Sequence, residues 1–241
     1  MDLLMTLLLL LLMAFQVTGE EAHERLGMAM FALFLLHQWL NRRWYRALFK
    51  GRYGLLRIIW TAVNMLLLGA FLITAASGMA MSRHILFSAD VWPGIYWARS
   101  AHLAGAYWSF ILMSVHLGLH WGMAVGRLPA GRRGASLNIL AVLAAGYGLY
   151  LFLTMDIPSY LFLTTQFAFL DYDKAAPFVL AENLAMMSFW VLLAHQGYKA
   201  LAGLVSKRWL SLLHPALTLG AAGGFSALLF MIFGGSSGSS W

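Results

Sequence analysis

The chain contains no cysteine among its 241 residues. Without thiols it cannot form disulfides, bind iron–sulfur clusters through thiolates, use a cysteine nucleophile or attach haem through a Cys-x-x-Cys-His motif. Histidine is therefore the side chain that we expect to bind any metal.

Charge is also scarce, since only 10% of the residues are charged whereas 61% are hydrophobic. Soluble domains carry about 25% charged residues. Several apolar runs reach or approach the roughly 20 residues that a helix needs to cross a bilayer. The runs are continuous and do not alternate, which favours helices over a membrane barrel. The composition thus predicts an all-α membrane protein.

The apolar pattern predicts about seven transmembrane helices. Their expected ranges are 3–18, 22–41, 56–82, 98–126, 136–155, 180–205 and 210–233. The first is expected to be a retained helix, because it lacks the basic n-region and the small-residue cleavage site of a signal peptide. We interpret residues 1–233 as a single transmembrane domain with a core at about 18–126 and a C-terminal three-helix part at about 136–233. Residues 234–241 are typical of a linker and the start of a tag.

Charged residues alternate between two sets of connections, as seven spans require. The first set holds twelve of the sixteen basic residues: Arg42, Arg43, Arg46, Lys50, Arg52, Arg57, Arg127, Arg132, Arg133, Lys199, Lys207 and Arg208. The second holds Glu20, Glu21, Glu24, Asp90, Asp156, Asp171, Asp173 and Glu182, with Arg25, Arg83, Arg99 and Lys174. The positive-inside rule makes the first set cytoplasmic, with the N-terminus inside and the C-terminus outside. Topology explains the net charge of +7, so no nucleic-acid partner is expected.

The longest predicted outer connection, at about 156–180, is too apolar for a solvated loop. We expect a short amphipathic piece at the outer membrane interface. An interfacial anchor is the favoured interpretation, and a docking surface or a lid over a quinone site is the alternative.

Four of the eight histidines form two pairs with equal spacing. His23 and His37 lie in the second predicted span, and His102 and His116 lie in the fourth. Fourteen helical steps fall within about 40° of a whole number of turns, so each pair shares one helix face with an axial rise of about 21 Å. One histidine of each pair is therefore expected near the outer leaflet and the other near the inner leaflet.

The two histidine helices are separated by one span and must run in the same direction. This places His23 level with His102, and His37 level with His116, which predicts two bis-histidine haem sites with irons about 20 Å apart. A lone membrane histidine is more often a hydrogen-bonded packing residue, but the equal spacings and the parallel direction favour ligation. His120 is a rival to His116 as the inner ligand, or a proton-handling or quinone-contacting group.

Residues next to these histidines could support a haem. Arg25 and Arg99 outside, and Arg42 and Arg43 inside, are placed to neutralise propionates, although interface anchoring explains arginines at such positions equally well. If His37 is level with His116, the second helix must extend past these inner arginines over about 44–49.

Small and polar residues inside the predicted spans complete the candidate set. Gly27 and Gly105 remove side chains where a flat macrocycle approaches the backbone. Asn64 is expected to form an interhelical hydrogen bond. A third haem on two of His120, His195 and His214 is a less favoured arrangement.

The sequences His23-Glu-Arg-Leu-Gly27, Leu36-His37-Gln-Trp-Leu-Asn41, Arg99-Ser-Ala-His102 and His116-Leu-Gly-Leu-His120 resemble a family of bacterial integral-membrane proteins of unknown function. The paired His-x13-His helices are also similar to those of respiratory cytochrome b subunits and ferric-reductase-like membrane domains. The resemblance covers about residues 18–126 and carries over only His23, His37, His102 and His116. It implies electron transfer between two b-type haems in the bacterial inner membrane.

We therefore expect a di-haem membrane electron-transfer protein, as an oxidoreductase subunit that works with a quinone or a separate redox polypeptide. No soluble flavin or nicotinamide domain of the ferric-reductase kind is recognisable in the sequence. The alternatives are a metal-ion or proton transporter that uses membrane histidines, and a haem-free membrane anchor of a redox complex. The spans offer few acidic residues for a transporter.

Overall fold

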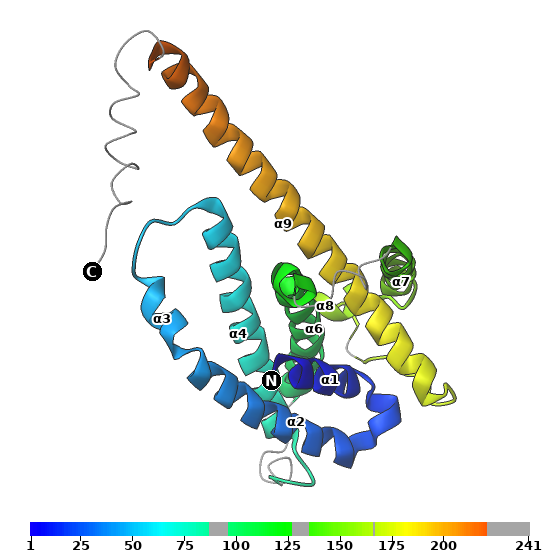
Figure 1. Cartoon of the computed structure of the whole chain (residues 1–241). Coiled ribbons are helices and arrows are strands. Elements are labelled where there is room, and N and C mark those ends of the chain that lie inside the picture. The colour runs from blue at the N-terminus through cyan, green and yellow to red at the C-terminus, as the bar shows by residue number, and fades with distance from the viewer. Residues whose placement is uncertain (87–95, 127–134, 166, 221–241) are drawn as a thin grey trace, which may run out of the picture. The chain divides into compact units, whose positions relative to one another are not determined.

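The computed structural model describes the backbone of residues 1–86, 96–126, 135–165 and 167–220, and their side chains except at 123–126, 135–137 and 206–220. Every regular element in these ranges is a helix, as the sequence predicts. The helices are α1 (Asp2–Met13), α2 (Phe15–Leu40), α3 (Arg42–Leu48), α4 (Leu55–Met81), α6 (Tyr96–Gly126), α7 (Ala135–Thr154), α8 (Ile157–Leu161) and α9 (Ala176–Gly220) (Figure 1).

Two described helices are long and apolar enough to cross a membrane. They are α4 and the Ala176–Val205 part of α9. Three of the predicted spans, 56–82, 98–126 and 136–155, agree within two residues with α4, α6 and α7.

The two ends of the chain differ from the predicted pattern. α1 has 12 residues, or about 18 Å at the helical rise, which is shorter than a span. α9 continues through residues 206–209, where the charge pattern predicts a connection. No glycine or proline occurs between 204 and 214 to end the helix there. The rest of the predicted seventh span, 221–233, and the predicted linker at 234–241 lie outside the described residues.

α1 and α2 form an N-terminal hairpin. α1 ends at Ala14, whose N–H donates to the carbonyl of Leu11 at 3.1 Å. Gly19 interrupts the start of α2 with a φ of +71°, a conformation that glycine adopts without steric cost. At the other end, the backbone N–H and the Nδ2 of Asn41 donate to the carbonyl of His37 at 3.0 and 2.9 Å. The chain then continues as the helix α3, which ends at Leu48. The predicted helical extension over 44–49 is therefore present except for its last residue.

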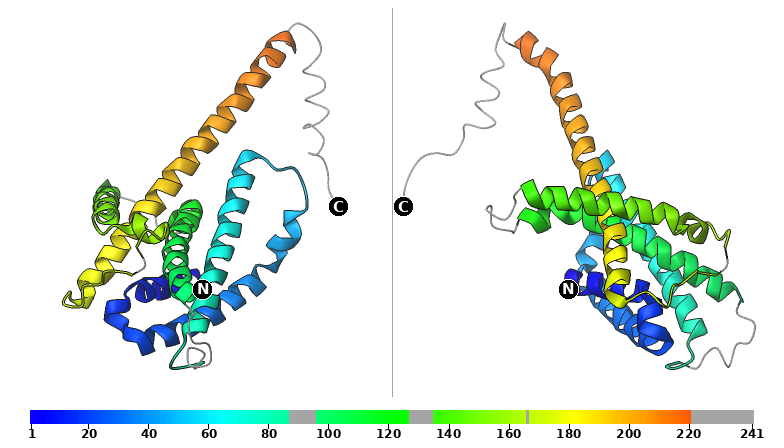
Figure 2. Two further views of the ribbon diagram at one scale, coloured as in Figure 1. Left: turned by 180° about the vertical axis from the view of Figure 1, so that it is seen from behind. Right: turned by 90° about the vertical axis from the view of Figure 1, so that its right-hand side faces the viewer.

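α4 and α6 pack side by side (Figures 1 and 2). A Cβ atom on Gly105 would come within 2.5 Å of Oγ1 of Thr74, so the glycine allows this close approach. The hydroxyl oxygens of Thr74 and Ser109 lie 3.3 Å apart across the same contact. Small residues therefore fix the spacing between the helix that carries two of the predicted ligands and its neighbour.

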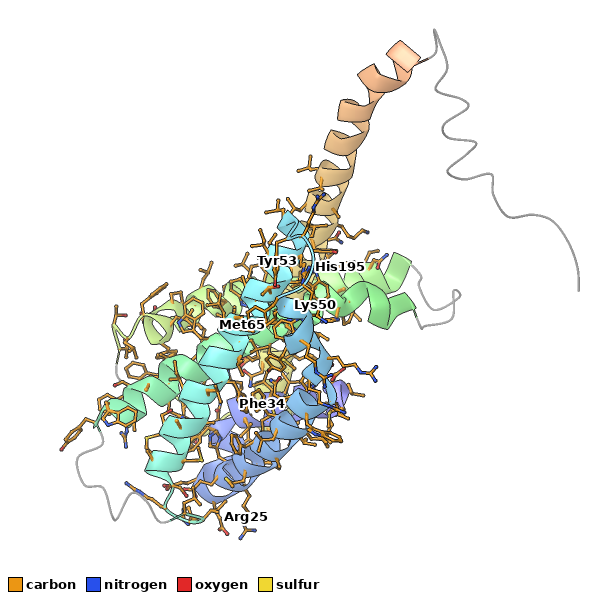
Figure 3. The ribbon with its side chains drawn as sticks, turned by 90° about the vertical axis from the view of Figure 1, so that its left-hand side faces the viewer. Arg25, Phe34, Lys50, Tyr53, Met65 and His195 are labelled. Carbon is orange, nitrogen blue, oxygen red and sulfur yellow. The ribbon has the colours of Figure 1, made fainter. Side chains whose placement is uncertain are left out.

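The chain divides into two compact units, Met1–Gln196 and Gly197–Trp241, with the boundary inside α9. In the first unit, Gly118 of α6 and Gly148 of α7 lie directly against the backbone of α9 at Val191 and Ala185. Of the second unit the structure describes residues 197–220, which are helical. Figure 3 shows Arg25 and Lys50 on either side of Phe34.

The predicted outer connection folds back onto α6 through α8. Tyr160 stacks on Tyr107 with ring centroids 5.0 Å apart. The indole Nε1–H of Trp108 donates to the carbonyl of Leu161 at 3.1 Å. Ile157, Tyr160 and Leu161 are buried, whereas the neighbouring Phe162 is 70% exposed. The segment therefore has one packed and one open side, as the predicted amphipathic piece requires.

Candidate histidine site

A cavity of about 1690 Å³ is lined by α1, α2, α4 and α6. Five of the eight histidines line it: His23, His37, His102, His116 and His120. Small-molecule sites usually have volumes of roughly 300–1,000 Å³, so this cavity exceeds what a single ligand of ordinary size needs. The structure thus brings the four predicted ligands and the rival His120 to one internal space.

His23 and His102, the pair predicted to lie near the outer leaflet, lie close together at one end of the cavity. Their imidazole centroids are 6.0 Å apart and their planes are inclined by 75°. A metal ion lies about 2 Å from a bound imidazole nitrogen, and that nitrogen lies about 1 Å from its ring centre, so two rings on opposite sides of one ion have centroids about 6 Å apart. The observed separation matches this requirement.

Hydrogen bonding orients His102 toward the cavity. Its Nδ1–H donates to the backbone carbonyl of Thr74 at 3.0 Å, and the hydroxyl of Ser77 lies 3.4 Å from the same nitrogen. An imidazole that donates through one nitrogen presents the other as a ligand. Nε2 of His102 is therefore the nitrogen available to a metal.

His23 has a buried nitrogen without a partner. Its Nδ1 makes no hydrogen bond with any described residue. The carbonyl of Leu12 lies near the ring, and Phe15 contacts the ring edge-on at 5.2 Å between centroids. A buried polar atom without a partner is costly, and a bound metal would remove that cost.

Three more histidines, His37, His116 and His120, line the part of the cavity that is predicted to lie near the inner leaflet. Nδ1–H of His116 donates to Oδ1 of Asn64 at 2.8 Å, which is the predicted interhelical hydrogen bond. The ring centroids of His116 and His120 are 4.6 Å apart. His37 lines the same cavity.

Asp2 and Trp60 complete the inner group. Oδ1 of Asp2 lies 3.4 Å from Nδ1 of His37. The ring of His120 packs edge-on against Trp60 with centroids 4.4 Å apart. His120 thus contacts both an aromatic neighbour and the ring of His116, and the structure leaves His116 and His120 as alternatives for the inner ligand.

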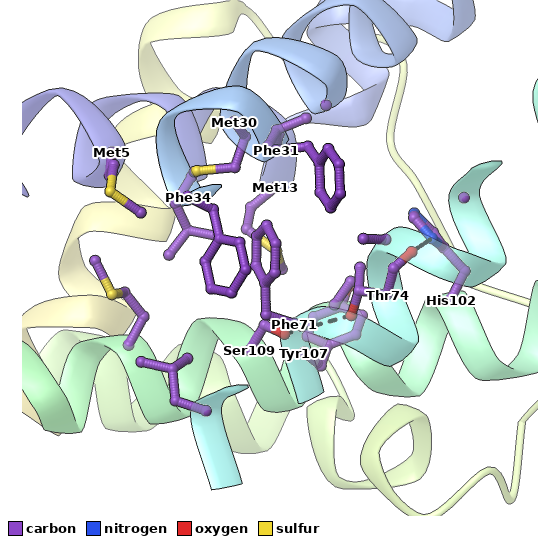
Figure 4. A pocket seen from close by; sticks show the side chains of 18 of the residues that line it. Met5, Met13, Met30, Phe31, Phe34, Phe71, Thr74, His102, Tyr107 and Ser109 are labelled. Atoms are coloured by element: carbon purple, nitrogen blue, oxygen red, sulfur yellow. Dashed lines mark hydrogen bonds between the residues drawn. The ribbon is translucent and has the colours of Figure 1, made fainter. Parts of the chain in front are cut away.

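An apolar layer separates the two histidine groups. Phe34 of α2 stacks on Phe71 of α4, with ring centroids 4.1 Å apart. Met5, Met30 and Met113 pack around this pair (Figure 4). On α4, Thr74 contacts His102 and Asn64 contacts His116. Phe71 lies between these two α4 residues, so the apolar layer separates the two groups of histidines.

The glycines next to the ligands differ in their surroundings. Gly27 lines the cavity, and nothing lies within 4 Å of the position that its Cβ would occupy. This is the open backbone surface that a flat macrocycle would need. Gly78, which the sequence analysis does not single out, lies directly behind His102, because its Cβ would be 3.0 Å from Cε1 of that ring.

Of the four candidate arginines, Arg99 is the one that lines the cavity among the described residues. Its guanidinium lies 5.7 Å from the ring centroid of Phe167, which also lines the cavity. Arg25 pairs with Glu21, and Arg42 donates to the carbonyl of Trp39 at 2.9 Å. Arg43 is exposed, so the structure does not gather these three with the histidines.

One further group of metal-ligating side chains occurs near the outer end of α2. Glu20, Glu24 and His84 each have a ligand atom within 4.8 Å of the others. The Glu24 carboxylate, however, already accepts hydrogen bonds from the Ser82 hydroxyl and from the N–H groups of residues 83–85. Its observed role is to hold the turn that follows α4.

His195 of α9 is not among the residues that line this cavity. His195 lies beside Gly122 of α6, whose Cβ would be 3.8 Å from Cε1 of the ring. The side chain of His214 lies outside the described part of the chain. Comparison of the chain with protein-family models, curated proteins and solved structures finds no match.

Proposed function

We propose that this chain is a membrane-embedded b-type cytochrome that carries electrons between two haems. His23 and His102 hold the outer haem, and His37 and His116 hold the inner one. The observation that carries the proposal is the 6.0 Å separation of the His23 and His102 rings at the end of a shared cavity. Haem supplies the one-electron chemistry, and the protein supplies ligation, spacing and a low dielectric.

The donor set supports haem over a cation in transit. Five histidines and three carboxylates, those of Asp2, Glu20 and Glu24, line the cavity. Neutral imidazoles are the usual axial ligands of low-spin haem. Phe34, Phe71 and the methionines and leucines packed around them are apolar side chains that offer no ligands to a hydrated ion. A transporter would need such ligands along its path.

The proposed membrane arrangement has about seven spans, with the N-terminus on the cytoplasmic side of a bacterial inner membrane. The basic residues of the 42–57 region then face the cytoplasm, as the positive-inside rule requires. Electrons enter from a quinol or from a separate redox subunit and leave at the opposite face. The outer segment that includes Phe167, which lines the cavity together with Arg99, would cover the outer haem.

Optical spectroscopy of the purified protein tests this function. We expect a reduced α-band and two haems per chain. His23→Ala and His102→Ala should each lower the haem content to one, whereas His84→Ala, which replaces a histidine outside the cavity lining, should leave two. A wild-type protein without haem, or an unchanged haem content in both ligand variants, contradicts the proposal and leaves a haem-free anchor as the better explanation.

The inner ligand is identified by comparing two variants on one helix. His116→Ala should remove the inner haem, whereas His120→Ala should retain it. The opposite result would assign the inner ligand to His120 and preserve the rest of the proposal.

A further inference from the structure

The four ligand histidines of the proposed function have different neighbours at Nδ1. A backbone carbonyl accepts from Nδ1–H of His102, an amide oxygen accepts from Nδ1–H of His116, and Nδ1 of His23 is buried without a hydrogen-bond partner among the described residues. His37 alone of the four lies next to a carboxylate at this atom, Oδ1 of Asp2 at 3.4 Å. The inner pair therefore has an anionic neighbour at a position where the outer pair has none.

α1 brings this carboxylate to the inner end of the cavity. Asp2 begins the helix, and residues from Met1 to Met13 line the cavity along its length. The side chain of Asp2 is 78% exposed, and its carboxylate lies beside His37.

A carboxylate beside the N–H of a ligating imidazole orients the ring and makes it a stronger electron donor to the metal. Stronger donation stabilises ferric iron relative to ferrous iron. Reduction adds one electron to the iron and breaks no bond, so the effect appears as a lower midpoint potential for the inner haem.

Resting on the proposed di-haem function, we propose that Asp2 is a positioning residue that lowers the midpoint potential of the inner haem through His37. Glu24 interacts electrostatically with His23 of the outer pair, but among the described residues no ion pair joins a carboxylate to Nδ1 of His23 or His102 as Asp2 does at His37, so the effect of Asp2 is assigned to the inner haem. A purely structural role for Asp2, as an acidic residue in the first turn of α1, would change stability without changing a potential.

Spectroelectrochemical titration of single-haem proteins tests the inference. His102→Ala retains only the inner haem, and His116→Ala retains only the outer one. In the inner-only protein, Asp2→Asn and Asp2→Ser should each raise the midpoint potential. The expected change is about tenfold in the ratio of reduced to oxidised haem at a fixed potential, or about 59 mV for one electron. In the outer-only protein the same substitutions should change nothing.

Two controls separate this effect from general charge loss. Glu21→Gln removes a carboxylate that lies outside the cavity lining and should leave the inner potential unchanged. Asp2→Glu keeps the charge and should restore much of the wild-type value. An unchanged inner potential in both neutral Asp2 variants that still bind haem overturns the inference while the di-haem function stands. A wild-type protein that binds no haem overturns both.

Discussion

The imidazole planes of His23 and His102 are nearly perpendicular, at 75°. His102 is held in this orientation by the carbonyl of Thr74, and Phe15 packs against His23. In low-spin ferric haem with two histidine ligands, perpendicular planes bring the iron d orbitals close in energy. We therefore expect a highly anisotropic EPR signal from the outer haem, lost in His102→Ala. A rhombic signal of the kind given by parallel planes would contradict this geometry.

Gly78 controls the orientation of His102. A Cβ atom here would lie 3.0 Å from Cε1 and 3.2 Å from Nδ1 of the ring, so Gly78→Ala should rotate the imidazole or displace it from Thr74. We expect a changed EPR signal and a weaker outer haem, measured by spectral titration with added haem. Gly69→Ala on the same helix places its methyl group in open space and should leave both unchanged. Equal behaviour of the two variants would show that the ring does not depend on this contact.

The helix content and the histidine faces could be predicted from the sequence, because both depend on local periodicity. The ranges of α4, α6 and α7 follow from continuous apolar runs. The fourteen-residue spacing of His23 and His37, and of His102 and His116, places all four on the lining of one cavity. These properties need only the rise and turn of a single helix.

Contacts from other helices could not be predicted in the same way. Thr74 holds His102 through a backbone carbonyl, a group that every residue has, so no side-chain pattern marks it. Asp2 reaches His37 only because the chain reverses between Ala14 and Gly19. Asn64 was recognisable as a polar residue in an apolar run, but its partner depends on how α4 packs on α6.

Asn64 should matter for the inner haem and not for the outer one. Asn64→Leu keeps the branched shape of the side chain but removes the acceptor for Nδ1–H of His116. Loss of such a partner typically lowers metal affinity by about 10–100-fold, and we expect this loss for the inner haem in a haem titration. Thr74→Val is the matched control, because His102 uses the backbone carbonyl of Thr74 and should keep its haem. Full inner occupancy in Asn64→Leu at limiting haem would argue against His116 as ligand.

The proposed topology can be mapped with single cysteines, because the natural chain has none. Lys50→Cys lies in the basic region proposed to be cytoplasmic, and Asp171→Cys lies in the proposed outer segment. A membrane-impermeant maleimide should label Asp171→Cys in intact spheroplasts and Lys50→Cys only in inverted vesicles. The reverse pattern would show that the topology is inverted. Labelling of both cysteines from one side would contradict the proposal that Lys50 and Asp171 lie on opposite sides of the membrane.

Two glycines of α7 should respond in opposite ways to the same substitution. At Gly148 an alanine methyl group would overlap the Ala185 carbonyl of α9, whereas at Gly146 nothing lies within 4 Å of the new atom. Overpacking of this kind costs about 1–3 kcal/mol, so Gly148→Ala should lower the midpoint of thermal unfolding in detergent. Gly146→Ala should leave the midpoint unchanged or raise it, because alanine is favoured over glycine in a helix by about 1 kcal/mol. The two positions share a helix and are two residues apart, so a general effect of replacing glycine in α7 would move both midpoints alike. A lower midpoint for Gly148→Ala alone would place the α7–α9 crossing where the structure has it.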